Sequence, residues 1–587
     1  AEIMKSTNGN PPALLDPFAG GGSIPLEAQR LGLKAYASDL NPVAVMINKA
    51  MIEIPPKFAG QPPVNPESRR QLGGEWKGAQ GLAEDVRYYG EWMKNKAFEK
   101  IGHLYPKVKD IHGLEHTVIA WIWARTVKCP NPACGCEMPL ANSFILSKKK
   151  GKEAYIQPII EGKSIRYEVK YGKNLPSSPK IARGKFKCIC CNSPVELNYI
   201  REESKQKRMK QHLIAIIAEG DSGQLFLSPN EEHILAANVS AAIDYPSGQL
   251  TGKAKVNVGV YGFEETADLF SNRQLTALTT FSDLVVKAQA QVEIDGGSKE
   301  YANAVGVYLA FAVDREADVS STIATWINSL GAIRNTFSRQ AIPMTWDYAE
   351  ANLFSNSTGC FSNMLNWIVK CIENLPTGEQ GIVKQADAQS DNGLRNIMVS
   401  TDPPYYDNIA YADLSDFFYV WLRHSLKGLF FDVFRTMLVP KAEELVAMAY
   451  RFDGSREKAK HFFENGMLDT FSRINSYVRN EIPLTIYYAF KQNDSDESDN
   501  TSSTGWETML SAIVQAGFSI TGTWPMRTER EVRTIASGSN ALASSIVLVC
   551  RKRLADAPIC TRRDFINTLK RELKPALKKL QQSNIAP

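Results

Sequence analysis

The chain has 587 residues and a formal net charge of +5 at neutral pH, with 44% hydrophobic and 22% charged residues. These proportions are ordinary for a soluble globular protein, and the length excludes a single hydrophobic core and predicts about three or four domains. We expect no membrane span, because no run of about 18 apolar residues is present, and no signal peptide, because the N-terminus lacks an apolar core.

Residues 13–54 predict the opening of a parallel sheet with helices on both faces. An apolar strand leads into a run of glycines, and after a helix a second strand ends in Asp39. Asn41-Pro42 then starts another helix, since proline is favoured in the first turn. The expected elements are a strand at 13–15, a helix at 24–31, a strand at 34–39 and a helix from residue 41. This alternation is typical of a doubly wound α/β fold.

The middle of the chain changes in composition three times. Residues 55–82 are rich in Pro and Gly and predict an irregular linker, whereas residues 84–127 interleave aromatic with charged side chains and predict helices. A region rich in cysteine and lysine follows to about residue 200, and residues 201–380 are predicted to be mostly helical.

The sheet resumes after residue 381. Strands are predicted at 381–388, 396–400, 483–490, 518–524 and 544–550, the last two as a hairpin-like pair. A polar, acidic surface loop is expected at 491–504 and a basic amphipathic helix at 561–587. We therefore expect an α/β fold with a seven-stranded, Rossmann-like sheet that is split by a long insert, because so long a connection must contain domains of its own.

A glycine-rich turn links the first strand to the first helix, in the sequence Asp16-Pro17-Phe18-Ala19-Gly20-Gly21-Gly22. Such a turn lets a ligand lie against bare backbone at a helix N-terminus. Asp16 is placed to meet a cofactor ammonium group, Asp39 to accept both ribose hydroxyls and Asp387 to accept an adenine amine. The predicted cofactor-binding residues are Asp16, Pro17, Phe18, Ala19, Gly20, Gly22, Asp39 and Asp387. A nicotinamide site is less favoured, since the G-x-G-x-x-G spacing is absent, and a plain tight turn is the alternative without a ligand.

A second motif follows the strand predicted at 396–400, in the sequence Thr401-Asp402-Pro403-Pro404-Tyr405-Tyr406-Asp407-Asn408. Asp402 and the Pro403 carbonyl can each accept an N–H of an aromatic amine, and both bonds strengthen as the nitrogen becomes tetrahedral and positive. The prolines fix the backbone, and Tyr405 can stack on a base or attract a sulfonium cation. The predicted catalytic residues are Asp402, Pro403, Pro404 and Tyr405. Together the two motifs indicate methyl transfer from S-adenosylmethionine to a nucleobase nitrogen; the alternative is a Pro-Pro strand end with a buried tyrosine.

Six of the ten cysteines lie between Cys129 and Cys191, which favours a metal site in a reducing cytoplasm over disulfides. Two candidate knuckles can form a closed tetrahedral site of structural zinc, and the favoured ligands are Cys129, Cys134, Cys188 and Cys191. Cys136 and Cys190 are spare, and either can replace a neighbour. Unliganded thiols are the alternative.

The segment 147–187, between the two knuckles, is strongly basic. It holds twelve Lys or Arg and three Glu, so its local net charge is +9. We expect these side chains to lie on the arms of the zinc ribbon and to contact phosphates, the alternative being a solvated hairpin. The pairs Arg273-Gln274 and Arg339-Gln340 can read base edges, although contacts between helices are the more usual role of such residues.

The sequence resembles the large prokaryotic adenine-specific DNA methylases that carry a zinc ribbon. The stretches that carry the resemblance are 16–22, the cysteines from Cys129 to Cys191, 402–408, and Trp524 with 543–551. The resemblance implies N6 methylation of a flipped adenine in DNA, with S-adenosylmethionine and structural Zn²⁺ as cofactors. It also implies a place in phage defence or restriction–modification, with other defence subunits as possible partners. A cytosine-N4 enzyme usually has Ser where Asp402 stands, so adenine is favoured.

The expected domains are 1–55 (first part of the methyltransferase domain), 56–127 (linker and helices), 128–200 (zinc ribbon with basic arms), 201–380 (helical target-recognition domain) and 381–587 (second part of the methyltransferase domain). Few residues precede Asp16, so we expect the segment that closes over the cofactor in such families to be absent or truncated. Two alternatives remain at this stage: a methyltransferase that acts on a base amine in RNA, and an inactive DNA-binding scaffold.

Overall fold

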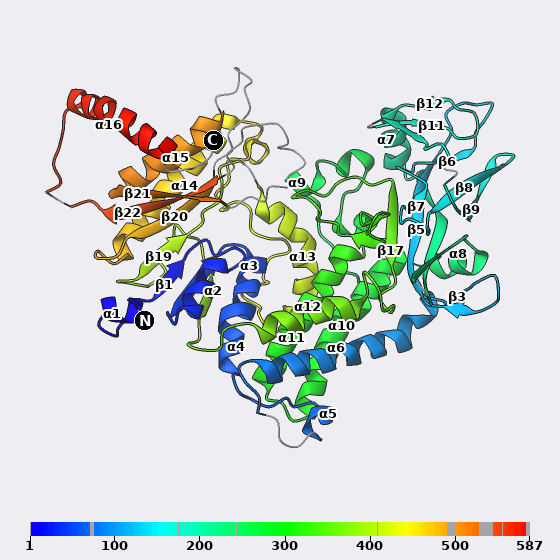
Figure 1. Ribbon diagram of the computed structural model, residues 1–587, viewed down its shortest axis with the longest axis horizontal. Helices are drawn as coiled ribbons and strands as arrows, with labels where there is room; N and C mark the ends of the chain where they lie inside the picture. Colours follow the sequence, from blue (N-terminus) through cyan, green and yellow to red (C-terminus); the bar gives the residue numbers. More distant parts are fainter. Residues whose placement is uncertain are drawn as a thin grey trace. The chain divides into compact units, whose positions relative to one another are not determined.

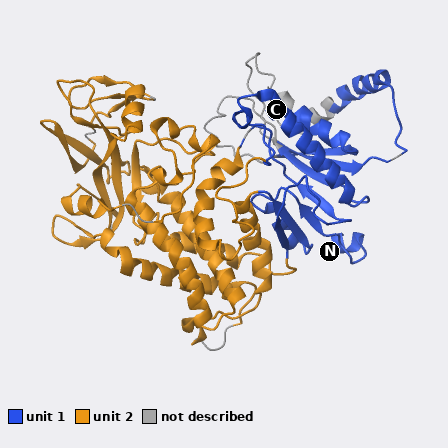
Figure 2. Cartoon of the chain, turned by 180° about the vertical axis from the view of Figure 1, so that it is seen from behind, with its two compact units in different colours: residues 1–40, 381–409, 443–587 blue, residues 41–380, 410–442 orange. Residues whose placement is uncertain are grey.

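The computed structural model describes residues 2–70, 75–173, 176–182, 184–221, 223–240, 244–407, 409–489, 501–527, 544–554 and 556–582. The chain forms two compact units, coloured separately in Figure 2: unit 1 (residues 1–40, 381–409 and 443–587) and unit 2 (residues 41–380 and 410–442). This division differs from our expected boundary at residue 55 and from the single segment 381–587. Within 410–442, the helix carries Trp421, Leu422 and Leu426 into the hydrophobic clusters of unit 2, which explains its assignment.

Unit 1 is built on a seven-stranded mixed sheet (Figure 1) with the order β18-β2-β1-β19-β20-β22-β21. Its strands are β1 (Leu14–Asp16), β2 (Ala35–Asp39), β18 (Ile382–Gln385), β19 (Met398–Thr401), β20 (Leu484–Ala489), β21 (Phe518–Arg527) and β22 (Ser544–Lys552). Its α-helices are α1 (Glu2–Ser6), α2 (Ser23–Arg30), α14 (Arg456–Tyr477), α15 (Thr501–Gln515) and α16 (Arg562–Gln582). β22 is antiparallel to both of its neighbours, and the other pairs of adjacent strands are parallel.

β1 is an inner strand of this sheet, between β2 and β19. Leu15 is in register with Tyr36 of β2 on one side and with Val399 of β19 on the other. Inner parallel strands are covered on both faces and therefore read as continuous apolar runs, as β1 does. Leu15 and Val399 belong to a buried cluster that also holds Phe463 of α14 and Ile513 of α15, so these two helices supply part of the sheet's cover.

All seven strands expected from the sequence are present in unit 1, and the last two form the expected antiparallel pair. The basic helix expected at 561–587 is α16. The prediction of an acidic loop at 491–504 is wrong at its C-terminal end, because α15 begins at Thr501. The rest of that loop, residues 491–500, lies outside the described residues, as do Asn408 of the second motif, Ala543 and Arg183.

Unit 2 contains a five-stranded sheet, β14-β13-β5-β17 with β6 on β5, two three-stranded sheets, β7-β8-β9 and β10-β11-β12, and two strand pairs, β3-β4 and β15-β16. Its strands are β3 (Val108–Lys109), β4 (Glu115–His116), β5 (Val118–Lys128), β6 (Glu137–Pro139), β7 (Ile145–Ser147), β8 (Ala154–Glu161), β9 (Ser164–Tyr171), β10 (Lys180–Ala182), β11 (Lys185–Lys187), β12 (Pro194–Val195), β13 (Lys210–Gly220), β14 (Gly223–Leu227), β15 (Thr325–Ile327), β16 (Ala332–Arg334) and β17 (Asp347–Ala351). Its α-helices are α3 (Pro42–Asn48), α4 (Ile54–Lys57), α5 (Pro66–Arg69), α6 (Gln80–Ile101), α7 (Leu197–Lys205), α8 (Glu231–Ala237), α9 (Gly252–Lys255), α10 (Asn272–Ile294), α11 (Lys299–Val319), α12 (Phe361–Glu373) and α13 (Tyr411–Leu426).

Two predictions for unit 2 need correction. Helices are predicted over residues 84–127, but only α6 is a long helix there, and Val118–Lys128 form strand β5. Every residue of β5 except Lys128 is buried, so the two-residue alternation that marks a half-buried strand is missing. Residues 201–380 are also less helical than predicted, because β13 and β17 flank β5 in the same sheet.

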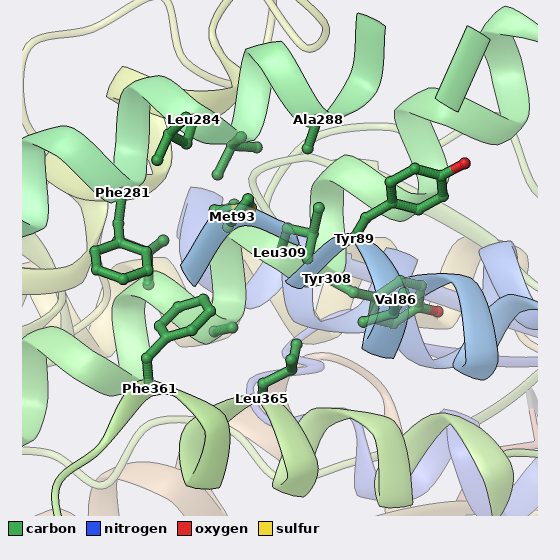
Figure 3. Close-up of a cluster of buried hydrophobic side chains, with 14 of the residues drawn as sticks. Val86, Tyr89, Met93, Phe281, Leu284, Ala288, Tyr308, Leu309, Phe361 and Leu365 are labelled. Carbon is green, nitrogen blue, oxygen red and sulfur yellow. The ribbon is translucent and has the colours of Figure 1, made fainter. Parts of the chain in front are cut away.

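The largest core of unit 2 lies where α6, α10, α11 and α12 meet, as Figure 3 shows. The side chains labelled there are Val86, Tyr89 and Met93 of α6, Phe281, Leu284 and Ala288 of α10, Tyr308 and Leu309 of α11, and Phe361 and Leu365 of α12. Gly90 allows α6 to approach α12, because a Cβ at this position would come within 2.4 Å of Leu365 Cδ2. No helix in the described ranges has the length and apolarity that a membrane crossing requires.

Candidate functional site

The carboxyl ends of the parallel strands in unit 1 bring acidic side chains to one edge of the sheet. Asp16 is the last residue of β1, Asp39 is the last of β2, and Asp402 directly follows β19. Both Asp39 and Asp402 raise the pKa of Asp16 through their charge, so the three carboxylates share one electrostatic neighbourhood. The strand order reverses between β1 and β19, and in open α/β sheets such a reversal opens a crevice at the carboxyl ends of the strands.

The glycine-rich turn after β1 is held by its own backbone and by Asp39. Gly20 and Gly22 have φ angles of 47° and 79°, a region that favours glycine. The Gly20 amide donates to Asp39 Oδ2 over 2.8 Å, and the Ala19 amide donates to the Ser38 carbonyl over 3.0 Å. A Cβ added at Gly21 would meet no atom within 4 Å, so this surface of the turn is open to a ligand.

Asp16 is the most buried carboxyl group of the candidate site. Its side chain accepts a hydrogen bond from Thr401 Oγ1 at 2.7 Å and another from the Phe18 amide at 3.1 Å. Desolvation by burial outweighs these bonds and raises the pKa of Asp16 to about 7. Thr401 is the first residue of the second motif, but the motif predicted no role for its side chain. This hydroxyl links the end of β19 to the end of β1.

Asp402 and Tyr405 form a hydrogen-bonded pair just beyond β19. The Tyr405 hydroxyl donates to Asp402 Oδ1 over 2.7 Å. Surrounding protein atoms desolvate the carboxylate and raise the pKa of Asp402, and the bond from Tyr405 partly offsets this shift. Asp402 is an exposed residue, so its carboxylate can still be approached from solvent, while the next residue, Pro403, is buried. The pair therefore presents a fixed hydrogen-bond acceptor at the surface of the sheet edge.

Aromatic rings extend from Tyr405 along the same part of unit 1. Tyr405 meets Tyr488 edge to face, with centroids 5.5 Å apart, and Tyr488 contacts Trp506 at 5.7 Å. Tyr406 has a φ of 35°, which is unusual for a residue with a Cβ, and its carbonyl accepts from the Ala447 amide at 2.8 Å. Strained backbone of this kind persists where surrounding contacts hold it, and it is concentrated at functional sites.

Asp387, the predicted acceptor of an adenine amine, lies two residues beyond β18. Its Oδ1 accepts from the Gln389 amide over 2.9 Å, and the Gln389 side-chain amide lies 3.3 Å from both carboxylate oxygens. The residue is half-buried, at the same edge of the sheet as Asp39, because β18 and β2 are parallel neighbours. Its carboxylate thus stabilises the turn that follows β18.

The cysteines of unit 2 gather where two antiparallel strand pairs end. Cys129 and Cys136 close the connection between β5 and β6, and Cys188 and Cys191 lie between β11 and β12. The four predicted ligands, Cys129, Cys134, Cys188 and Cys191, have sulfurs that all lie within 4.8 Å of one another. Such a group can hold a metal ion, and four thiolates suit structural zinc. The Ser193 hydroxyl, 3.2 Å from the Cys191 sulfur, lowers the pKa of the Cys191 thiol, whereas burial raises the pKa of Cys129.

We expected the basic segment 147–187 to form the arms of the cysteine-bearing strands, but the structure differs. Most of the segment forms the separate sheet β7-β8-β9, because the eight-residue strands β8 and β9 pair along their whole length. Its three glutamates pair within the segment, Glu161 and Glu168 with Arg166 and Glu153 with Lys173. The exposed basic side chains of the segment include Lys148, Lys149, Lys150, Lys152, Lys163, Lys170 and Lys185.

Arg273 cannot read a base edge, because it is fully buried. Its guanidinium donates to both carboxylate oxygens of Glu350, at 3.0 and 2.8 Å, and lies over the ring of Trp121. Arg339 and Gln340 are exposed.

Comparisons of the chain with protein-family models, with curated proteins and with solved structures gave no match. The functional assignment therefore depends on the geometry of unit 1 and on the chemistry of its side chains.

Proposed function

We propose that the chain is a methyltransferase that transfers a methyl group from S-adenosylmethionine to the N6 amine of adenine in DNA. The observation that carries the proposal is the Asp402–Tyr405 hydrogen bond just beyond β19. β19 is the neighbour of β1, the strand that leads into the glycine-rich turn. Ligands of open α/β sheets bind at the carboxyl ends of the strands, where the strand order reverses. A base amine and a methyl donor can meet in that crevice.

The residues around the glycine-rich turn fit an adenosyl cofactor. Asp39 would accept the ribose hydroxyls, Asp387 the adenine amine, and the open backbone at Gly21 would allow close approach. Asp16, with a pKa of about 7, would become ionised beside a cationic ammonium group, which would offset the cost of its burial. When bound, S-adenosylmethionine supplies an electrophilic methyl group. Side chains and backbone groups of unit 1 bind the cofactor and position the base amine.

At the base end, Asp402 makes the aromatic amine a better nucleophile. Tyr405 occupies Oδ1 of Asp402, and we assign Oδ2 and the Pro403 carbonyl to the two N–H groups of the amine. Both bonds strengthen as positive charge develops on nitrogen, which stabilises the transition state more than the ground state. Tyr405, which is partly exposed and packs edge to face against the buried Tyr488, offers an aromatic face to a base that has left the duplex.

The sheet order also supports the proposal. Numbered along the chain, the strands run 3-2-1-4-5-7-6 with the seventh antiparallel, so the order reverses between the first and the fourth strand, where open α/β sheets bind ligands. On this view the insert reads the target through residues 201–380, and the exposed lysines of β7-β8-β9 contact phosphates. A place in phage defence, with partner subunits, comes with the family resemblance and is part of the same proposal.

The test is methyl transfer from labelled S-adenosylmethionine to host DNA, with RNA as a parallel substrate. We expect Asp402→Ala to lower the rate by at least about a hundredfold, since one lost transition-state acceptor costs about 3 kcal/mol. Cofactor affinity, measured by calorimetry, should change little. Asp469→Ala, which removes an exposed carboxylate from α14, is the matched control and should keep full activity.

Three results would count against the proposal. Near-normal turnover of the Asp402→Ala protein would remove the residue from the site. Methylation of RNA but not of DNA would move the substrate to the alternative class. DNA binding without cofactor binding in the wild-type chain would favour an inactive scaffold.

A further inference from the structure

Six cysteines of unit 2, not only four, lie in one cluster. Besides the group of four, Cys136, Cys188 and Cys190 form a second group whose sulfurs are all within 4.8 Å of one another. Cys188 belongs to both groups. The cluster is surrounded by apolar residues of the same unit, including Met138 and Phe186, and Cys136 and Cys188 are themselves buried.

Several sulfur–sulfur distances in the cluster match those between ligands of one tetrahedral metal ion. Zinc–sulfur bonds of about 2.3 Å in a tetrahedral site place the sulfurs about 3.8 Å apart. The Cys134 and Cys188 sulfurs are 3.9 Å apart, and those of Cys129 and Cys191 are 3.7 Å apart. The Cys136 and Cys188 sulfurs are 3.3 Å apart, and the Cys190 sulfur lies within 4.8 Å of both. Cys188 thus joins the group of four to the pair Cys136 and Cys190.

We propose that this cluster binds two metal ions that share the thiolate of Cys188. Cys129, Cys134 and Cys191 complete the ligands of the first ion, and Cys136 and Cys190 join Cys188 at the second, so the two sites use all six cysteines. The second ion then has three thiolate ligands and a fourth position for a solvent molecule. The Cys136 and Cys188 sulfurs, now 3.3 Å apart, must separate by about 0.5 Å to reach the tetrahedral spacing.

The charge balance favours a second ion. One Zn²⁺ among four thiolates beside two neutral thiols has the same net charge as two Zn²⁺ among six thiolates. Binding of the second ion therefore adds no net charge to a partly buried site, and it releases two protons, from Cys136 and Cys190. Soft thiolates select zinc and other thiophilic ions over Mg²⁺ or Ca²⁺. Cys136 and Cys190, which would remain unliganded thiols in a single-ion site, thereby become ligands.

The experiment is metal stoichiometry of the full chain, purified without chelator under reducing conditions and loaded with Zn²⁺. Mass spectrometry of the metal content should give two ions per chain for wild type and one for the double variant Cys136→Ser/Cys190→Ser. The double variant Cys371→Ser/Cys560→Ser, at exposed cysteines outside the cluster, is the matched control and should keep two. A cadmium-113 spectrum should change from two resonances in wild type to one in the Cys136→Ser/Cys190→Ser protein.

A single ion in the zinc-saturated wild-type chain would overturn the proposal, because Cys136 and Cys190 would then be only substitutes for their neighbours. The reciprocal variant Cys129→Ser/Cys191→Ser guards against a folding artefact, since it should also retain one ion, held by Cys136, Cys188 and Cys190. Loss of all metal from both double variants, with wild type at two, would mean that each ion needs the other. Metal content does not depend on methyl transfer, so this result is independent of the proposed activity.

Discussion

Replacement of Asp16 by asparagine should stabilise unit 1 above neutral pH. Burial raises the pKa of Asp16 from 3.8 to about 7, so the folded chain keeps a proton that the unfolded chain loses. Below about pH 4, Asp16 is protonated in both the folded and the unfolded chain and does not affect the free energy of unfolding. Between about pH 4 and pH 7, the free energy of unfolding falls as the pH rises. Above about pH 7 the loss of stability is complete. At about 1.4 kcal/mol per pKa unit, the full loss is about 4 kcal/mol.

Asparagine avoids this loss because it cannot ionise. Its amide oxygen can still accept from Thr401 Oγ1 and from the Phe18 amide, as the protonated carboxyl does. Without cofactor, the Asp16→Asn protein should therefore be more stable than wild type by up to about 4 kcal/mol at pH 8 and by little at pH 4. The same change should weaken cofactor binding, since the negative charge offered to an ammonium group is gone.

The chain has two units, so unfolding must be followed in unit 1 alone. Urea unfolding monitored by hydrogen–deuterium exchange of peptides that cover β1 and β19 gives this local reading. The Asp469→Asn variant, at an exposed position of α14, provides the control and should leave the curve unchanged at both pH values. If Asp16→Asn gives no stabilisation at pH 8, or the same gain at pH 4 and pH 8, the reasoning from burial is refuted.

Two further predictions concern the core of unit 2. Gly90→Ala should destabilise this unit by about 1–3 kcal/mol, because the new methyl group would overlap Leu365, whereas Gly378→Ala, with no atom within 4 Å, should be neutral in the same thermal-unfolding assay. Arg273→Met should cost about 3–5 kcal/mol, because it leaves Glu350 charged and buried, and the double variant with Glu350→Leu should recover most of that loss in urea unfolding. Equal stability of Arg273→Met and wild type, or of Gly90→Ala and wild type, would contradict these packing arguments.

The strands of unit 1 could be predicted because each combines an apolar run with a boundary signal. β1 precedes glycines, β2 ends in Asp39, and β19 leads into a Pro-Pro pair. β5 could not be recognised in the same way, since it is buried along both faces and lacks alternation. The sequence also did not indicate which unit each helix belongs to. α13 closely follows the Asp402 motif of unit 1, yet its apolar side chains are buried in unit 2.

The acidic residues of the candidate site could be named from strand ends alone, because parallel strands align their carboxyl ends. What the sequence did not reveal is how they are held. The bond from Thr401 to Asp16, the positive φ of Tyr406 and its contact with Ala447 all join segments that are distant in the sequence or depend on backbone conformation. The four clustered cysteines Cys129, Cys134, Cys188 and Cys191 could be predicted from their spacing, but that spacing did not indicate that Cys136 and Cys190 form a second group with Cys188.

The division of the chain has a consequence for synthesis on the ribosome. The backbone passes between unit 1 and unit 2 four times, after residues 40, 380, 409 and 442. At about 5–20 residues per second, β1 must wait on the order of tens of seconds for its neighbour β19 to be made. During that time β1 and β2 have unpaired edges, which invite aggregation. The two units are therefore completed in alternation, with α13 added to unit 2 only after β19 has become available to unit 1.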